Sequence, residues 1–411
     1  MILSRNRDFF FMWLGQVMSQ AALRMFQIAI MWWIIAVNAG GSGTQAGLFM
    51  VSGALPPILF ANAIGRWVER FQSKYILIMC AIAACVVAAG VSALFHASQI
   101  SIAGSFIAGF LMALLQAFMD PTLNKAVMEV VESHDVEDAV AFQSSTQSLA
   151  NFGGAVAGAM LIDLLGIANV VMAGAASFFL AAASYYCVRF RYALEPKGKK
   201  SQEAALSGWK VLSEMPLIRK VLIGFGLVNF FATPTLVVLP LYTKHALHAS
   251  ATVMGILEAS LWIGLLAGTF SSRWVNFTRN TLRLGALCIA TMGVCFIVPG
   301  LMVDRIVYAA MLFGVGFALG VNNVKFIALF QKTVAQDRKG RFFAIMQAVI
   351  SFTFPIAYFL FGALADIMTP PKVCMIQGAG VVCVAFFFFI LSRSHECGSD
   401  ESPAPMPLNL S

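Results

Sequence analysis

Charged residues are scarce in this 411-residue sequence. Asp, Glu, Lys and Arg together make up 11% of it, while hydrophobic residues make up 60%. Soluble globular domains carry about 25% charged residues, so this composition excludes that class. Long polar segments are also rare, and residues 189–215 form the only such stretch in the interior of the chain. We therefore expect an integral membrane protein.

The usual motifs of catalytic and metal sites are missing as well. The eight cysteines are scattered and include no C-x-x-C pair, which argues against a disulfide framework and a thiolate metal site. Neither H-E-x-x-H nor G-x-S-x-G occurs. His134 has no second histidine at ligand spacing, and His245 and His248 lack an evident third ligand. We expect no metal, no cofactor and no enzymatic activity, with a membrane-embedded enzyme or a sensor as distant alternatives.

Apolar runs of about twenty residues, each long enough to cross a bilayer as a helix, recur from end to end. The opening run is too long for a signal-peptide core and lacks a cleavage site, so it counts as a span. The sequence thus predicts an all-α membrane protein with about twelve transmembrane helices. The expected spans are 9–37, 45–67, 75–95, 100–120, 142–165, 167–188, 219–241, 251–273, 284–303, 305–330, 342–364 and 373–392.

Basic residues are distributed unevenly between the two sides of the expected bundle. With the N-terminus inside, the outer loops contain only three of them, Lys244, Arg305 and Lys372. This positive-inside bias predicts a multi-pass protein of the cell inner (cytoplasmic) membrane with both termini in the cytoplasm. It also accounts for the net charge of +8 without a nucleic-acid partner.

A weak internal repeat accompanies the polar interior stretch. Gly268 and Arg273 lie 203 positions after Gly65 and Arg70, although Ser272 stands where Glu69 would be expected. The repeat favours two pseudo-symmetric halves. The predicted organisation is an N-terminal six-helix half at 1–188, a cytoplasmic linker at 189–215, a C-terminal six-helix half at 216–392 and a disordered cytoplasmic tail at 393–411.

The stretch between the second and third spans has a distinctive spacing. Gly65 is followed by Glu69-Arg70 and then by Lys74. This pattern resembles the signature loop of major facilitator superfamily transporters, with Glu where Asp is usual. The resemblance implies that these four residues form a gating loop, and the alternative is an ordinary basic loop between membrane helices.

Glycines gather in the fifth span. Gly153, Gly154 and Gly158 are spaced so that two helix backbones can approach closely. The pattern resembles the fifth-helix signature of exporters in the same superfamily, without its usual proline, and it implies a role in helix packing.

Further motifs resemble the macrolide-efflux and enterobactin-exporter branch of that superfamily. They are spread over most of residues 5–392. They comprise the opening Trp13–Gln16, Ser19, Ala175–Leu180, Gly316 with Asn322 or Asn323 and Gln331, and Gly340-Arg341-Phe342. The resemblance implies the major facilitator fold and export of a small organic molecule.

Polar side chains inside the spans are the candidate site. Arg24 lies near the expected middle of the membrane, where a charge costs about 2.5–3.5 kcal/mol on insertion scales. It is expected to face a cavity and meet an anionic or strongly polar group, or else to form a structural ion pair. The candidates for the substrate cavity are Gln20, Arg24, Gln27, Gln116, Asn229, Glu258, Asn322 and Gln347.

Glu258 is the candidate for proton coupling, because a carboxyl group in apolar surroundings can exchange a proton during a transport cycle. The alternative is a structural partner for Arg24. Relatives in the resembling branch often have a Gly-Asp pair just before the arginine position, whereas Ala22-Leu23 stand here. A membrane acid is therefore missing, which places proton antiport by the same route in doubt.

These observations predict a secondary active transporter that works by alternating access. Its expected task is export of a siderophore or an amphipathic drug such as a macrolide, with protons as the candidate coupling ion. The expected partners are a small-molecule substrate and the lipid bilayer, and the protein is expected to be a monomer. An importer or flippase of an anionic amphiphile such as a lysophospholipid is the alternative, since fold alone does not determine cargo.

Overall fold

A computed structural model describes residues 6–38, 41–132, 135–190, 216–275, 281–334 and 339–399. Within these ranges every regular element is helical and there is no strand. The helices are α2 (Arg7–Trp32), η1 (Trp33–Val37), α3 (Gly43–Leu59), α4 (Ala61–Arg70), α5 (Ser73–His96), α6 (Ile102–Val130), α7 (Val136–Leu165), α8 (Ile167–Cys187), α10 (Pro216–Ala232), α11 (Thr235–His245), α12 (Ala251–Ser271), α13 (Thr281–Leu301), α14 (Arg305–Thr333), α15 (Lys339–Ile367) and α16 (Pro370–Ser399).

The expected membrane spans correspond to these helices. Ten described helical segments are long and apolar enough to cross a bilayer, and the bent pair of α3 and α4 provides an eleventh. The twelfth expected span corresponds to α7, whose apolar part is the shorter segment Phe152–Leu165. The prediction of an all-α bundle with about twelve crossings is therefore confirmed.

Two expected spans are broken helices. The axes of α3 and α4 differ by 56°, and the bend follows Pro56 and Pro57, whose rings remove two backbone donors from the helix. The seventh span likewise divides into α10 and α11 at Thr233-Pro234. At the other end of the chain, α16 continues to Ser399 and so extends beyond the expected boundary at 392.

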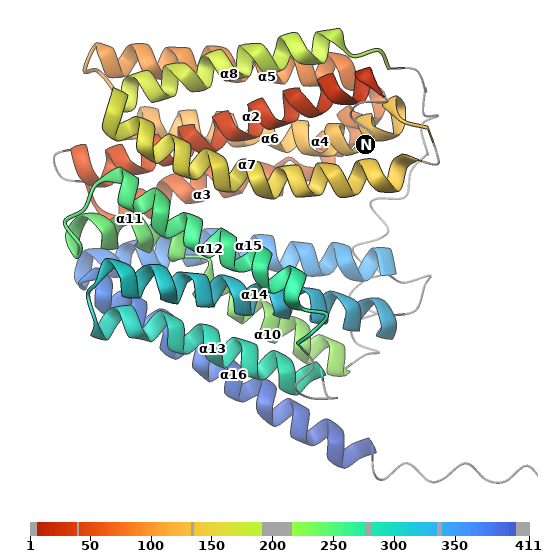
Figure 1. Cartoon of the computed structure of the whole chain (residues 1–411), viewed down its shortest axis with the longest axis vertical. Coiled ribbons are helices and arrows are strands. Elements are labelled where there is room, and N and C mark those ends of the chain that lie inside the picture. The colour runs from red at the N-terminus through yellow and green to blue at the C-terminus, as the bar shows by residue number, and fades with distance from the viewer. Residues whose placement is uncertain are drawn as a thin grey trace, which may run out of the picture.

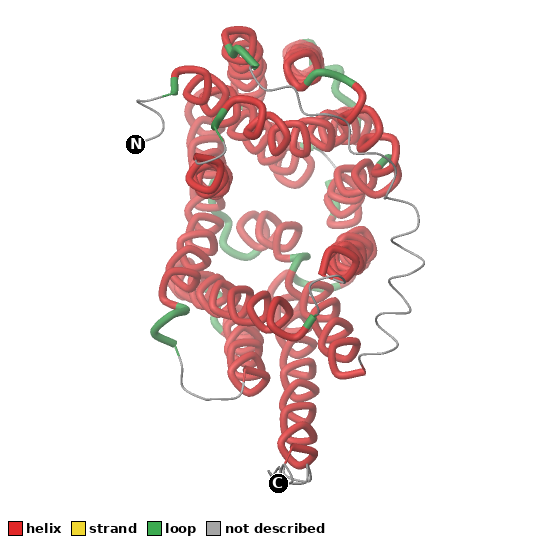
Figure 2. Tube along the Cα trace, turned by 90° about the vertical axis from the view of Figure 1, so that its right-hand side faces the viewer, coloured by secondary structure: helices red, strands yellow, loops and turns green. Residues whose placement is uncertain are grey.

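Two helix groups lie side by side (Figure 1). The first group comprises α2 to α8, and the second comprises α10 to α16. Figure 2 shows the same groups after a turn of 90°. Contacts between the groups are formed mainly by α3 with α15 and by α7 with α12. The division at residues 188 and 216 stays a prediction, and the expected linker lies almost wholly outside the described residues.

Small residues bring α12 and α14 close together. A Cβ on Gly268 would overlap the carbonyl oxygen of Phe317, and one on Gly316 would overlap that of Leu261. No side chain fits at either position, so these glycines set the distance between the two helices.

The glycines of the fifth span also pack, but within the first helix group. A Cβ on Gly154 would meet the Arg24 Cβ at 3.0 Å, and one on Gly158 would meet the Met25 Cα at 3.1 Å. Both glycines therefore hold α7 against α2. Gly153 differs, because a Cβ there would meet no described atom within 4 Å. The packing prediction is wrong for Gly153 in this conformation, because its Cα faces open space.

Candidate functional site

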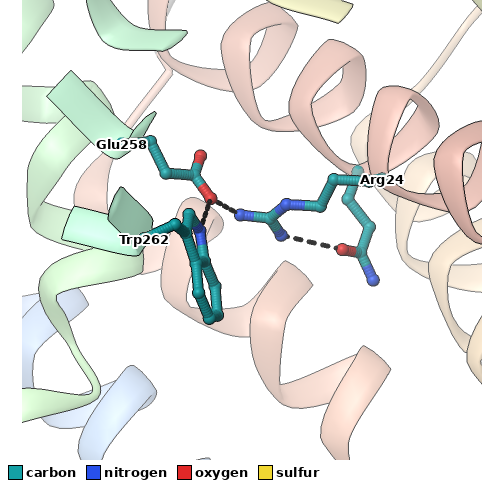
Figure 3. A network of polar contacts seen from close by, with 4 residues as sticks. Arg24, Glu258 and Trp262 are labelled. Carbon is teal, nitrogen blue, oxygen red and sulfur yellow. Dashed lines mark hydrogen bonds and ion pairs between the residues drawn. The ribbon is translucent and has the colours of Figure 1, made fainter. Parts of the chain in front are cut away.

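An ion pair joins the two helix groups. Arg24 projects from α2, and its guanidinium Nη2 donates to the Glu258 carboxylate on α12 (Figure 3). The other end of the guanidinium donates to Gln27 Oε1 at 3.0 Å. Trp262 Nε1 donates to the same Glu258 oxygen at 3.2 Å. On α2, Gln27 lies about one turn from Arg24 and orients it. On α12, Trp262 lies about one turn from Glu258 and orients that carboxylate.

The ion pair is buried, so each charge depends on the other for compensation. The side chains of Arg24 and Glu258 are only 12% and 5% exposed. Removing either partner would leave an uncompensated charge in a medium of low polarity. The sequence left open whether the two residues are paired or act separately, and in this conformation they are paired.

Three cavities meet at Gln27. The first, here called the ion-pair pocket, is about 20 Å³ and includes Arg24, Glu258 and Met50 in its wall. The second, here called the aromatic cavity because Phe26, Phe49, Phe354 and Tyr358 line it, is about 210 Å³. The third, here called the Asp120 cavity after the acid in its wall, is about 360 Å³. Gln27 lines all three, so it lies at their junction.

The walls of the two larger cavities are mostly apolar. The aromatic cavity is lined by Phe26, Gln27, Phe49, Met50, Gly53, Ala54, Gly109, Met112, Phe354 and Tyr358. The Asp120 cavity is lined by Leu23, Gln27, Gly53, Pro57, Ala61, Ile64, Ala113, Gln116, Ala117, Asp120 and Pro121. Such walls suit a ligand with a large apolar body and a few polar groups.

Gln116 and Asp120 share one face of α6. Gln116 Nε2 donates to Asp120 Oδ1, across one helical turn. The sequence-based span ended at Asp120, but α6 continues to Val130, so both side chains face the cavity from within a continuous helix. Asp120 was not among the predicted site residues, although its spacing of four from Gln116 was a usable signal.

Four predicted cavity residues are not in the walls of these three cavities, and their role in the substrate path stays a prediction. Gln20 is buried in α2 and does not line any of the three cavities. Asn322 is 1% exposed and lies beside Gly285 of α13, within the second helix group. Asn229 Nδ2 donates to the carbonyl of Phe225 at 2.9 Å within its own helix. Gln347 is exposed, with Ser351 Oγ at 3.4 Å. Polarity inside a span did not distinguish these residues from cavity residues, because each faces a direction that the sequence pattern does not fix.

The predicted gating loop is mostly helical. Gly65, Glu69 and Arg70 belong to α4, and Lys74 belongs to the first turn of α5. Glu69, Arg70 and Lys74 thus lie in helices where a loop between the spans 45–67 and 75–95 was expected, because the chain resumes a helix directly after the bend at Phe60. The gating role of the four residues stays a prediction. Lys74 Nζ donates to the carbonyls of Tyr186 and Val188, at 2.7 and 3.0 Å, where α8 ends. A cation at a helix C-terminus is favourable.

A second lysine holds the end of α4. Lys125 of α6 donates to the carbonyls of Val68 and Phe71, at 2.8 and 3.1 Å. Gly65 of this short helix is exposed, and a Cβ there would meet no described atom within 4 Å. The α4 segment is thus fixed to the first helix group and free of close contacts at the glycine.

The sequence matches a family model over most of its length. The model for the Major Facilitator Superfamily aligns with residues 12–358. The chain belongs to this superfamily. The predicted family is confirmed, and the chain is a multi-pass membrane transporter.

Relatives of this superfamily member agree with that result. Macrolide efflux protein A of Streptococcus pyogenes is 22% identical over 394 residues, which cover 92% of this chain and 94% of that protein. Among solved structures, a bacterial homologue of the human lysosomal transporter Spinster, in an inward-facing and unoccupied conformation, matches with a TM-score of 0.75. The identity is 14%, with 97% of this chain and 99% of the other covered.

A point mutant of the nucleoside transporter NupG has a TM-score of 0.74 at 13% identity, with 93% of this chain and 99% of the other covered. At these identities the structural matches show the fold and leave the substrate undetermined.

Proposed function

We propose that this protein exports an amphipathic, neutral or cationic small molecule of the macrolide type by alternating access. The observation that carries the proposal is the pairing of Arg24 with Glu258. Because the carboxylate compensates the arginine charge, Arg24 is not available to an anionic substrate in this conformation. The similarity to macrolide efflux protein A supports the same class of cargo.

The cavity walls support the proposal as well. Phe26, Phe49, Phe354 and Tyr358 surround the aromatic cavity, which contains no charged lining residue. A macrolide combines a large apolar ring with few ionisable groups, so such a wall would contribute most of its binding free energy through burial. A siderophore, or the headgroup of a lysophospholipid, would need an uncompensated cation instead.

Ligand-induced thermal stabilisation tests the cargo class, because a ligand that binds the folded state raises the unfolding temperature. The panel comprises erythromycin, an anionic siderophore and a lysophospholipid, each added to the purified protein. Wild type, the single variant R24A and the charge-neutral double variant R24Q/E258Q are compared. We expect erythromycin to stabilise both proteins. Stabilisation by the siderophore or the lysophospholipid alone, lost in R24A, would replace this proposal with a carrier of anionic amphiphiles.

Transport direction requires a separate assay. Everted vesicles expose the cytoplasmic side, so an exporter should accumulate labelled erythromycin in them and right-side-out vesicles should not. Accumulation in right-side-out vesicles only would identify an importer. We also propose a location in the cytoplasmic membrane with both termini in the cytoplasm, which protease digestion of the termini in intact everted vesicles would test.

Proton coupling through Glu258 forms part of the proposal. Arg24 and Trp262 both donate to its carboxylate, so a proton can replace the arginine only when the ion pair opens. Coupling would then mean that the Glu258 carboxylate binds Arg24 in one conformation and a proton in the other. The exchange would occur when α2 separates from α12. We further propose that the protein acts as a monomer, with each helix group forming one half of the rocking pair.

A further inference from the structure

The Asp120 cavity contains a carboxylate that no described cation compensates. Asp120 is the only charged residue in the wall of this cavity. Gln116 donates to one of its oxygens. Arg24 and Lys125 pair with other acids, Glu258 and Glu129. The charges that line the three neighbouring cavities therefore add up to one negative charge, located at Asp120.

We propose that Asp120 is the cation-recognising residue of the substrate site. Its ligand would be a lipophilic monocation, whose charged group approaches the free carboxylate oxygen while its apolar body fills the Asp120 cavity and the adjoining aromatic cavity. Gln116 orients the carboxylate, and Gln27 lies where the two cavities join. This inference deepens the proposed function by assigning cation selectivity to one residue.

The geometry favours a cation over a neutral polar group. The surrounding wall residues Leu23, Pro57, Ile64 and Ala113 are apolar. Interactions between charges are stronger beside such a wall than in bulk water. Asp120 would attract a bound monocation and repel an anion.

Two probes of the same shape and opposite charge test the assignment. Tetraphenylphosphonium is a permanent cation, and tetraphenylborate is an anion with the same four phenyl rings. Binding to the purified full-length protein is measured by equilibrium dialysis. We expect wild type to prefer the cation, and we expect D120N to raise the Kd of the cation at least tenfold. D120E, which retains the charge, should bind within a few-fold of wild type.

Two further variants complete the test. E69Q removes an exposed acid outside the cavities and should leave the Kd unchanged. A117F keeps Asp120 but fills part of the cavity wall, and it should abolish binding, which covers the case in which D120N does not fold. Unchanged binding in D120N or A117F, or equal binding of the two probes by wild type, would overturn the assignment. Because no transport is measured, the site can stand even if macrolide export fails.

A second, independent set of contacts joins the helix groups at the ends where α3 and α12 begin. Asp366 of α15 accepts hydrogen bonds from the Gly43 and Thr44 amides, at 2.5 and 2.9 Å, and from the Thr44 hydroxyl at 2.5 Å. Asp163 of α7 accepts from the Thr252 amide at 2.8 Å and from its hydroxyl at 2.6 Å. Each carboxylate thus binds the first turn of a helix in the opposite group, where negative charge is favourable.

The two contacts are related by the internal repeat. Asp366 lies 203 positions after Asp163, the same offset as between Gly65 and Gly268. Both receiving helices begin with Ser-x-Thr, at Ser42–Thr44 and Ser250–Thr252. A helix of each group therefore donates to an acid of the other, in a reciprocal arrangement.

From this symmetry we infer that Asp163 and Asp366 are paired latches that hold this end of the bundle closed and release together during transport. Spin labels at Q99C and K372C, in a cysteine-free background, report the distance between the groups at this end. We expect D163A/D366A to shift the distance distribution towards longer values, with the single variants intermediate. If the double variant does not fold, the smaller shift expected in D163A and in D366A still tests the inference.

Asp304 provides a matched control. It accepts from the Ile306 and Val307 amides, at 2.8 and 2.9 Å, at the start of its own helix. D304A also removes hydrogen bonds between a carboxylate and helix N-terminal amides, but it breaks no contact between the helix groups. Its distance distribution should therefore match that of the unsubstituted protein. A shift in D304A equal to that of D163A/D366A, or no shift in folded D163A/D366A, would overturn the latch assignment.

Discussion

Arg24 of α2 and Glu258 of α12 form a buried ion pair that connects the two helix groups beside the ion-pair pocket. Gln27 binds the arginine from the same helix, and Trp262 binds the glutamate from the other. The pair is thus oriented from both sides, and it has to open when the groups separate.

The first prediction concerns the stability of this pair. R24Q should destabilise the protein by about 3–5 kcal/mol, because Glu258 is left buried without its cation. E258Q should cost a similar amount for the converse reason. The double variant R24Q/E258Q should be more stable than either single variant, since no charge remains. Unfolding curves in one detergent measure all four proteins, and simple addition of the two single effects would contradict the pairing.

The second prediction concerns the energy source. If Glu258 exchanges Arg24 for a proton, E258Q should lose transport driven by a pH gradient, whereas E258D should retain part of it. Proteoliposomes with an imposed pH gradient and labelled erythromycin provide the measurement. Full pH-driven transport by E258Q would rule out Glu258 as the coupling residue. Substrate exchange without a gradient serves as the control, because it requires a working cavity but no net proton movement.

Hydropathy and charge were sufficient to predict the crossings of this protein. Runs of apolar residues identified the helices because no backbone polar group can stay unpaired in lipid. The breaks were harder to place. Pro56-Pro57 signalled the bend between α3 and α4, but the chain resumes a helix at Ala61, so Glu69 and Arg70 are helical where a loop was expected.

The site was predicted only in part, because sequence polarity does not tell which way a side chain faces. Arg24, Gln27, Gln116 and Glu258 do line cavities. Asn322 is equally polar, yet it is buried within the second helix group. The pairing of Arg24 with Glu258 spans 234 positions, and no local pattern encodes a contact of that range.

The third prediction concerns the contact between α12 and α14. G268V should destabilise the protein by about 1–3 kcal/mol or more, because its side chain would overlap the carbonyl of Phe317 and force the two helices apart. G153A is the matched control, since a Cβ at Gly153 meets no described atom within 4 Å. It should raise stability by up to about 1 kcal/mol, the usual gain from replacing a helical glycine. Equal melting temperatures for the two variants would contradict the close packing.

The last prediction separates stability from gating at the end of α4. K74M removes two hydrogen bonds to the carbonyls that end α8, so it should lower the melting temperature. Glu69 is exposed, and E69Q should leave the melting temperature unchanged.

If the superfamily's gating role applies, Glu69 acts only in another conformation of the cycle, and E69Q should slow transport several-fold without changing the Kd for the substrate. Melting, binding and transport measured on the same preparations test this. A normal transport rate in E69Q would show that Glu69 has no gating role, whereas a lower melting temperature would show that it stabilises the present conformation.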